Sequence, residues 1–360
     1  MNFRSAEYLD FEGVMLLLIR NGLKIRCKEN WENLWKKNPS FDKSIDSKGI
    51  VCEVNNKIIG YFGWFPMKYH LHNKEIKALA SHTFVIDDSY RSIFLRFIKE
   101  FFNQKKINLY LMTTVGHSGM NKIFSLYNSQ KVPVELYNRP LYYVLKYDKV
   151  VIYIYKKISR IIRILPQRPI LYVLNIFAKI KRMLLLHNES DKIHRYYKFN
   201  DKFDKFWEIY LNHHHDILLF NRSMISLQWH FGHLIIENGW VQTYEKNSQI
   251  LGYIICIEEI GDIFRKVNIV DIIAIGDSPN EIYKSLFNSS ILLAYKGGYD
   301  IIELVGFNKN IRKTFKKYFP INRKFSVCPY LYNAKTNELK NILTNPKYWI
   351  PSMIDGDASI

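Results

Sequence analysis

The sequence lacks the cysteine patterns that mark zinc sites and disulfide frameworks. Cys27, Cys52, Cys256 and Cys328 lie far apart, with no CxxC pair and no histidine at zinc-ligand spacing. Such cysteines fit reduced thiols in a cytoplasm. His213 to His215 are consecutive, and adjacent side chains on a helix point in different directions. We therefore expect no metal site and interpret these histidines as a solvated or substrate-lining run.

Features of secreted and membrane-spanning proteins are also missing. Arg4, Glu7, Asp10 and Glu12 interrupt the opening residues, which do not resemble a signal peptide. The strongly apolar stretch 150–187 carries eight Lys and Arg residues, so no uncharged run in it reaches the roughly 18 residues of a spanning helix. We expect a cytoplasmic protein.

The same apolar and basic stretch predicts a helical linker. Pro166 and Pro169 divide it into two helices in which basic and apolar residues follow an amphipathic pattern. Its apolar face would pack between two domains while its Lys and Arg side chains are solvated. The alternative is a basic hairpin that lies on an anionic membrane, at the periphery of the inner membrane.

The composition predicts a folded protein with two cores. The chain has 360 residues, of which 48% are apolar and 15% aromatic, and this is ample for two packed interiors. Its formal net charge of +19 attracts polyanions. The charge alone does not select among nucleic acid, anionic lipid and phosphorylated small molecules.

A partial repeat indicates that one small fold is used twice. Residues 54–61 return as 245–253, and in each copy a short polar turn joins two β-rich runs. A third strand, a helix, a strand, a second helix and a last strand follow both times. This order predicts two α/β units.

We place the first unit at 1–148, the helical linker at 149–190 and the second unit at 191–360. In the first unit we expect strands at 49–54, 57–71, 74–86 and 108–114 and helices at 11–21, 31–37 and 91–103. In the second unit we expect strands at 240–244, 249–258, 266–275, 300–305 and 325–332 and helices at 280–296 and 308–319.

The segment from Ile86 to Phe94, IDDSYRSIF, joins a strand to a helix, where N–H groups and the helix dipole can hold a pyrophosphate. It resembles the coenzyme A motif V-x-P-x-Y-R-G-x-G of the GNAT acyltransferase superfamily, with Asp88 in place of Pro and with Ser92 and Phe94 in place of Gly or Ala. The resemblance implies tandem GNAT-like domains with mixed, largely antiparallel sheets and acyl-coenzyme A as co-substrate. It implies these coenzyme-binding residues: Phe84, Val85, Ile86, Arg91, Ser92 and Ile93.

A second segment, LYNSQ at 126–130, resembles the family motif L-Y-x-K-x-G-F, with Lys131 and Val132 in place of the G-F ending. The resemblance implies that Tyr127 is the general acid that protonates the leaving thiolate. The aligned residue of the second unit is Phe315, and a phenyl ring cannot donate a proton. We therefore expect the first unit to be the catalytic one.

Amide formation also needs a group that takes the proton of the amine. Ser81, His82 and Thr83 interrupt an apolar strand beside the expected thioester, and a histidine has a suitable pKa for a base. His82 is therefore the candidate base, and a hydrogen-bonded core or surface histidine is the alternative. Asp271 aligns with it in the second unit, where a carboxylate in an apolar strand needs a partner or a function.

Two further segments resemble one branch of the superfamily. Arg222 with QWHF at 228–231, and the ending WIPSMIDGD at 349–357, look like double-GNAT N-acyltransferases of bacterial polysaccharide biosynthesis, which act on nucleotide-linked amino sugars. The resemblance implies acceptor contacts by Arg222, Trp229, Trp349 and Asp355. For the two tryptophans, the alternative is a place in the core.

The sequence therefore predicts an N-acyltransferase that moves an acyl group from coenzyme A to the amine of a nucleotide-linked deoxyamino sugar, for O-antigen or capsule. No nucleic acid partner is expected. One alternative is a Fem-like transferase that takes its acyl group from charged tRNA, which the charge favours. Another is a non-catalytic protein on decayed GNAT units that binds polyanions or membranes, with a steep dependence on salt.

Overall fold

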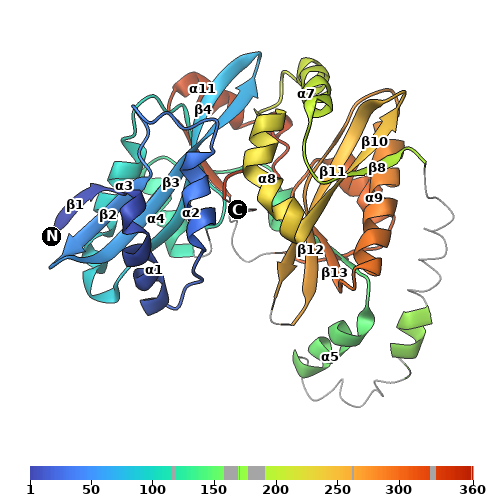
Figure 1. Cartoon of the computed structure of the whole chain (residues 1–360), viewed down its shortest axis with the longest axis horizontal. Helices are drawn as coiled ribbons and strands as arrows, with labels where there is room; N and C mark the ends of the chain where they lie inside the picture. The colour runs from blue at the N-terminus through green and yellow to red at the C-terminus, as the bar shows by residue number, and fades with distance from the viewer. Residues whose placement is uncertain are drawn as a thin grey trace. The chain divides into compact units, whose positions relative to one another are not determined.

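In the computed structural model, the described residues are 1–115, 118–157, 169, 171–176, 191–261, 263–324, 330–357 and 359. The chain forms two compact units (Figure 1). Unit 1 consists of Met1–Glu135, His214–His230 and Ser326–Ile360, and unit 2 consists of Leu136–His213 and Phe231–Phe325. Both units are thus built from separate stretches of chain and differ from the continuous ranges 1–148 and 191–360.

Unit 1 contains one mixed sheet with the order β1-β2-β3-β4-β5-β15-β6, and β9 pairs with β3 beside this path. The strands are β1 (Asn2–Ser5), β2 (Gly49–Val54), β3 (Lys57–Leu71), β4 (Lys74–Ile86), β5 (Leu109–Met112), β6 (Gln130–Lys131), β9 (Leu219–Phe220) and β15 (Leu331–Ala334). All these strand pairs are antiparallel except β4 with β5, which run parallel.

Helices cover both faces of this sheet (Figure 1). The helices of unit 1 are α1 (Phe11–Arg20), α2 (Lys28–Lys36), α3 (Phe94–Phe102), α4 (Ser118–Leu126) and α11 (Asn337–Leu343), with the short 3-10 helices η1 (Tyr8–Asp10), η2 (Asp88–Ile93) and η5 (Pro346–Tyr348). Side chains alternate along a strand, so Phe62 and Trp64 of β3 pack on Phe101 of α3. Tyr61, the residue before Phe62, faces Trp31 of α2 on the opposite side.

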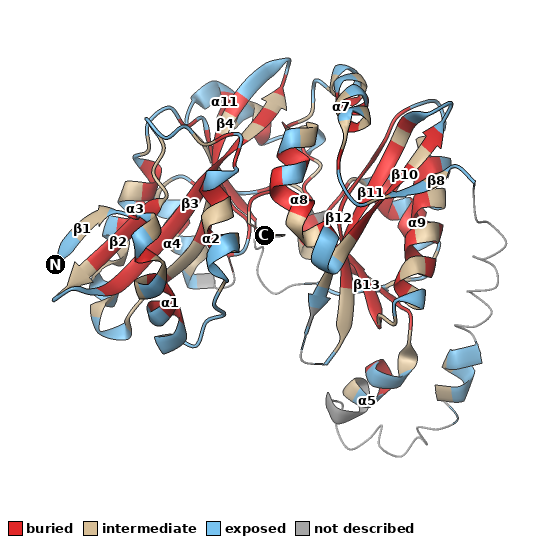
Figure 2. Cartoon of the chain, viewed as in Figure 1, coloured by how far each residue is buried: buried red, intermediate tan, exposed pale blue. Residues whose placement is uncertain are grey.

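Unit 2 contains a second mixed sheet with the order β14-β7-β13-β12-β11-β10-β8. Its strands are β7 (Leu141–Val144), β8 (Ile193–Tyr196), β10 (Gly239–Lys246), β11 (Gln249–Ile260), β12 (Arg265–Ala274), β13 (Ile301–Leu304) and β14 (Ile321–Asn322). Its helices are α5 (Tyr147–Lys157), α7 (Asp201–His213), α9 (Pro279–Lys296) and α10 (Lys309–Lys316); α8 (Met224–Asn238) and η3 (Glu135–Asn138) lie where the chain passes between units. Buried residues line β11, β12 and α9 (Figure 2).

The repeat expected from the sequence is present in both sheets. In unit 1, Asn55 and Asn56 have φ angles of 48° and 60° and join β2 to β3. In unit 2, Asn247 and Ser248 have φ angles of 50° and 63° and join β10 to β11. Two consecutive positive φ angles are those of a type I′ hairpin turn, which asparagine tolerates. The same type of turn therefore joins β2 to β3 in unit 1 and β10 to β11 in unit 2.

One expected strand belongs to the other unit. The sequence analysis placed a strand at 325–332 in the second unit, but β15 pairs with β5 and β6 in unit 1. Residues 325–329 lie outside the described residues. In unit 2, β7 from the first half of the chain pairs with β13. The sheet of unit 1 thus contains two short strands from the second half of the sequence, β9 and β15, and the sheet of unit 2 contains one from the first half, β7.

Most of the expected linker, 149–190, lies outside the described residues. Within the part of the linker that the structure describes, α5 covers its first residues. Val150 of this helix packs with Val144 and Ile301 of unit 2. Among the described helices, none is both long enough and apolar enough to cross a bilayer.

Candidate functional site

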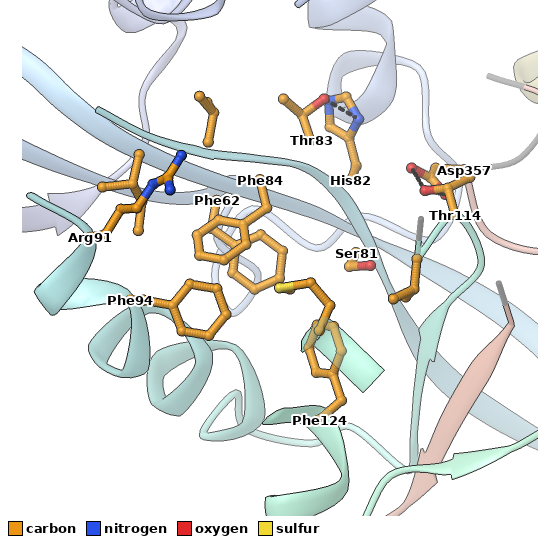
Figure 3. Close-up of a pocket in the computed structure, with 14 residues that line it drawn as sticks. Phe62, Ser81, His82, Thr83, Phe84, Arg91, Phe94, Thr114, Phe124 and Asp357 are labelled. Atoms are coloured by element: carbon orange, nitrogen blue, oxygen red, sulfur yellow. Dashed lines mark hydrogen bonds between the residues drawn. The ribbon is translucent and has the colours of Figure 1, made fainter. Parts of the chain in front are cut away.

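Strands β4 and β5 separate part-way along their length. They pair over Ala78–Ala80 and Leu109–Leu111, and β4 then continues to Ile86 without β5 beside it. A cavity of about 560 Å³ opens there in unit 1 (Figure 3). Its lining comprises Phe62, Ser81, His82, Thr83, Phe84, Val85, Ile86, Arg91, Phe94, Thr114, Val115, Met120, Phe124 and Asp357.

The cavity is lined from both faces of the sheet. Ser81 and Phe84 are paired with Trp64 and Phe62, so they lie on the α3 face. His82 is paired with Gly63 and lies on the opposite face. Figure 3 shows His82 and the phenylalanines on opposite sides of β4. The space where β4 leaves β5 therefore joins an aromatic end to a polar end.

A β-bulge shapes β4 at this point. Phe62 pairs with Phe84 and the next residue, Gly63, pairs with His82, so Thr83 has no partner on β3. Thr83 has a φ of 39°, which is strained for a β-branched residue. A bulge re-aims the groups of its strand. The bulge thus changes the direction of the β4 edge in the middle of the cavity.

The polar end holds a carboxylate from the far end of the sequence. The hydroxyl groups of Thr113 and Thr114 donate to Asp357 Oδ1 over 2.7 and 3.0 Å, and the Asp357 N–H donates to Thr113 Oγ1 over 3.1 Å. Gly356 has a φ of 62°, and a Cβ built there would lie 2.5 Å from Thr113 Oγ1. Glycine therefore permits this close approach.

Burial shifts the pKa values of the two titratable groups at the polar end, His82 and Asp357, in opposite directions. Desolvation lowers the pKa of His82 well below its usual value, and the charge of Arg26 lowers it further. Desolvation raises the pKa of Asp357, although hydrogen bonds from both threonines and the charge of Arg26 oppose the shift. Burial disfavours the charged form of either group. His82 is therefore a neutral imidazole near neutral pH, and its Nδ1 lies 2.9 Å from Thr83 Oγ1.

The chain segment that carries Asp357 is anchored in the core of unit 1. The Tyr69 hydroxyl donates to Asp355 Oδ1 over 2.8 Å, and burial raises the pKa of Tyr69 well above its usual value. The Trp349 ring packs 5.0 Å from the Tyr332 ring, and its indole N–H donates to the Leu343 carbonyl. These contacts fix the backbone two residues before Asp357.

The four residues expected to contact an acceptor are buried in this core and do not line the cavity. Their exposed fractions are 3% for Arg222, 8% for Trp229, 5% for Trp349 and 6% for Asp355. The Trp229 indole N–H donates to the Asn33 carbonyl, and Arg222 donates to the Phe220 carbonyl. Direct contact with an acceptor stays a prediction for all four.

The Tyr69 hydroxyl anchors the chain segment that carries Asp357 through its hydrogen bond to Asp355, and removal of this hydroxyl tests the anchor. In Tyr69→Phe the buried Asp355 carboxylate loses one donor, so we expect the free energy of unfolding to fall by about 1–3 kcal/mol. Urea denaturation at pH 7 measures the change. Tyr8→Phe, at a half-buried ring, is the matched control and should change stability by less than about 0.5 kcal/mol. Equal stability of the two variants would contradict the anchor.

The coenzyme residues expected from the sequence divide into two groups. Phe84, Val85, Ile86 and Arg91 line the cavity, as does Ser81. Ser92 and Ile93 lie in η2 outside the lining. The Arg91 guanidinium donates to the exposed Asp88 carboxylate over 2.7 Å at the edge of the cavity.

Two of the expected catalytic residues lie away from the cavity. Tyr127 follows the last residue of α4, and its ring stacks on Phe102 at 5.2 Å, with its hydroxyl 3.5 Å from the Leu95 carbonyl. Phe124, one turn earlier, lines the cavity instead. Asp271 lies in the core of unit 2, where the Tyr253 hydroxyl donates to it over 2.7 Å. A catalytic role for Tyr127 or Asp271 stays a prediction.

Asp357 was not among the predicted site residues, although it lies in the predicted segment 349–357. The spacing Asp355-Gly356-Asp357 offered two carboxylates, and Asp355 was selected. Asp355 is buried at the Tyr69 hydroxyl, and the glycine turns the chain so that Asp357 reaches the cavity. Among the residues described, no cluster of three His, Cys, Asp or Glu side chains could hold a metal ion.

No family model and no curated protein matches the sequence. Solved structures match its fold. Saccharomyces cerevisiae N-myristoyltransferase with bound myristoyl-CoA aligns over 93% of this chain and 79% of its own, with a TM-score of 0.57 and 13% identity. The fold is that of the N-acyltransferases related to GCN5.

Two bacterial structures support the same assignment of the fold. A probable N-acyltransferase from Enterococcus faecalis V583 aligns over 92% of this chain and 72% of its own, with a TM-score of 0.56 and 11% identity. A GCN5-related N-acetyltransferase from Kribbella flavida aligns over 92% and 70%, with a TM-score of 0.53 and 9% identity. The predicted fold class, two GNAT-like α/β units with mixed sheets, is confirmed.

Proposed function

We propose that this protein is an N-acyltransferase that uses acyl-coenzyme A and that unit 1 holds the reaction site. The observation that carries the proposal is the cavity where β4 leaves β5. The fold supports it, since the yeast N-myristoyltransferase that shares this fold is described with bound myristoyl-CoA. The aromatic end of the cavity suits a thioester donor, and the polar end suits an amine acceptor. The two substrates would meet where β4 leaves β5.

The edge of β4 from Ser81 to Ile86 is the proposed place for the pantetheine arm. No described strand pairs with this edge on the side of β5, so its backbone groups can bond an extended ligand with amide groups of its own. Phe62, Phe84, Phe94 and Phe124 would cover the arm on the α3 face. Water is thereby kept from the thioester.

The pyrophosphate would lie at the Arg91 end of the cavity. Arg91 is 74% exposed, and its one ion-pair partner among the described residues is Asp88, which is 79% exposed. Such a surface ion pair contributes about 0–1 kcal/mol, so a phosphate can replace the carboxylate at little cost. The first N–H groups of α3 follow directly after η2 and add favourable dipoles.

For the acceptor we propose the amine of a nucleotide-linked deoxyamino sugar, as used in O-antigen or capsule. The resemblance of the segments around Arg222 and Trp349 to double-GNAT sugar acyltransferases supports this choice. The net charge of +19 suits a diphosphate-bearing substrate. The amine would enter at the polar end, where His82, Thr114 and Asp357 line the cavity.

The function is tested by thiol release from a panel of acyl-coenzymes, from acetyl to myristoyl, each mixed with nucleotide-linked amino sugars. We expect release that requires both substrates, and mass spectrometry should find the amide. A hydroxyl analogue of each sugar controls for hydrolysis. Absence of release with every pair, together with no coenzyme-dependent rise in Tm, would contradict the proposed function.

Arg91→Ala tests the coenzyme end of the site. Loss of one charge-assisted contact to phosphate should weaken coenzyme A binding about tenfold, which corresponds to about 1.4 kcal/mol. Titration calorimetry measures the Kd. Arg96→Ala is the matched control, because Arg96 is exposed on α3 over the Phe3 ring and lies outside the cavity lining. Equal Kd values for the two variants would place the pyrophosphate elsewhere.

A further inference from the structure

Four features of Asp357 point to a function. It is partly buried, it lines the cavity, it is held by Thr113 and Thr114, and its backbone reaches the site through Gly356, where a side chain would collide with Thr113. Its partners on the protein are neutral hydroxyl groups and no salt bridge is present for it among the described residues. A charge in such a place costs stability and calls for a function.

His82 is less suited to hold a proton at this end. It is 2% exposed, and burial together with Arg26 opposes the imidazolium form. Arg26 is the charged group of the described residues that acts on both His82 and Asp357, and the other titratable groups that act on Arg26 are Tyr61 and Cys27. A positive charge favours the carboxylate and disfavours a second cation. An incoming ammonium group would therefore find its favourable partner in Asp357.

We propose that Asp357 is the catalytic base that takes the proton of the acceptor amine, with Thr113 and Thr114 holding its carboxylate in place. This inference rests on the proposed function. Asp357 lines the polar end of the cavity, so the amine would reach the thioester carbonyl from that end. His82 would then stay neutral, and its contact with the Thr83 hydroxyl would hold the bulge in place.

The proton and electron balance is simple. The ammonium group of the acceptor gives one proton to the Asp357 carboxylate and becomes a free amine. Its nitrogen lone pair attacks the thioester carbonyl carbon, the C–N bond forms, and the C–S bond breaks with departure of the coenzyme thiolate. The second amine proton goes to the thiolate, and Asp357 returns its proton to solvent. The products are the amide and the free thiol of coenzyme A.

Asp357→Asn tests the proposal with little change in shape, because the amide oxygen still accepts from the two threonines. We expect kcat/KM for the amine to fall by roughly 100-fold or more at pH 7, with KM for acyl-coenzyme A within threefold of wild type. The wild-type pH–rate profile should have an acidic limb above the usual pKa of an aspartate, since burial raises the pKa of Asp357. That limb should disappear in the variant.

Two controls separate a catalytic role from a structural one. Asp357→Glu keeps the charge and should retain the acidic limb at reduced kcat. Asp277→Asn removes an exposed carboxylate of unit 2 and should leave kcat within twofold. An Asp357→Asn enzyme with unchanged kcat/KM and an intact acidic limb overturns the inference while the proposed function stands. A wild-type enzyme that releases no thiol with any amine overturns both.

Discussion

Ser81→Trp should abolish acyl transfer and acyl-coenzyme A binding, with no detectable binding at millimolar ligand. Ser81 is paired with Trp64 and lines the cavity on the α3 face. An indole at this position would project into the space where β4 leaves β5 and would occupy the path of the pantetheine arm. The expected cost in stability is small, because the ring enters a cavity of about 560 Å³ rather than a packed core.

Titration calorimetry with acetyl-coenzyme A and the thiol-release assay measure the effect of Ser81→Trp, and a thermal melt checks that the variant is folded. Ser125→Trp is the matched control. Ser125 is exposed on α4 and lies outside the cavity lining, so this variant should bind and react within threefold of wild type. Wild-type binding by Ser81→Trp would show that the coenzyme uses another surface.

Deletion of residues 331–360 should prevent unit 1 from folding. The deletion removes β15, which pairs with both β5 and β6, and it removes the buried Tyr332 and Trp349 rings. Burial of one large aromatic side chain is worth about 3–5 kcal/mol against alanine. Loss of two such rings and a strand is comparable to the whole stability of about 5–15 kcal/mol of a typical domain.

Amide hydrogen exchange of β3, β4 and β5 measures this effect. In the shortened chain these amides should exchange without protection, while those of β11 and β12 in unit 2 stay protected. Addition of residues 331–360 as a separate peptide should restore protection in unit 1. Protected β5 amides in the shortened chain would contradict the assignment of β15 to this sheet.

The sequence predicted the long strands well because their signals are local. Two asparagines mark the β2–β3 turn, and the runs that follow are long enough to show where they end. The expected ranges 49–54, 57–71 and 74–86 match β2, β3 and β4 residue for residue. Because the same turn recurs before β11, the corresponding strands of unit 2 could be predicted as well.

The exchange of short strands could not be predicted in the same way. β7 and β15 have four residues each, and nothing in four residues specifies which sheet they join. Their pairing is decided by the open edges of β13 and β5, which exist only once both sheets have formed. A division of the chain into two continuous domains follows naturally from sequence and differs from the structure for this reason.

The candidate site could likewise be predicted only where its residues lie close together in the sequence. Ser81, His82 and Arg91 were predicted from one strand and the turn after it, and they line the cavity. Asp357 reaches the cavity through contacts with Thr113 and Thr114, more than 240 residues earlier. Tyr127 was predicted as the general acid, but it follows the last residue of α4, Leu126, and its ring stacks on Phe102. Tertiary contacts decide both positions.

The most direct test of the account is a crystal structure of the protein with a non-cleavable thioether analogue of acyl-coenzyme A. The account predicts the pantetheine arm along β4 from Ser81 to Ile86, pyrophosphate at Arg91, and the sulfur beside the Thr83 bulge within reach of the polar end. An analogue bound in unit 2, or a cavity between β4 and β5 that stays empty at saturating ligand, would contradict it.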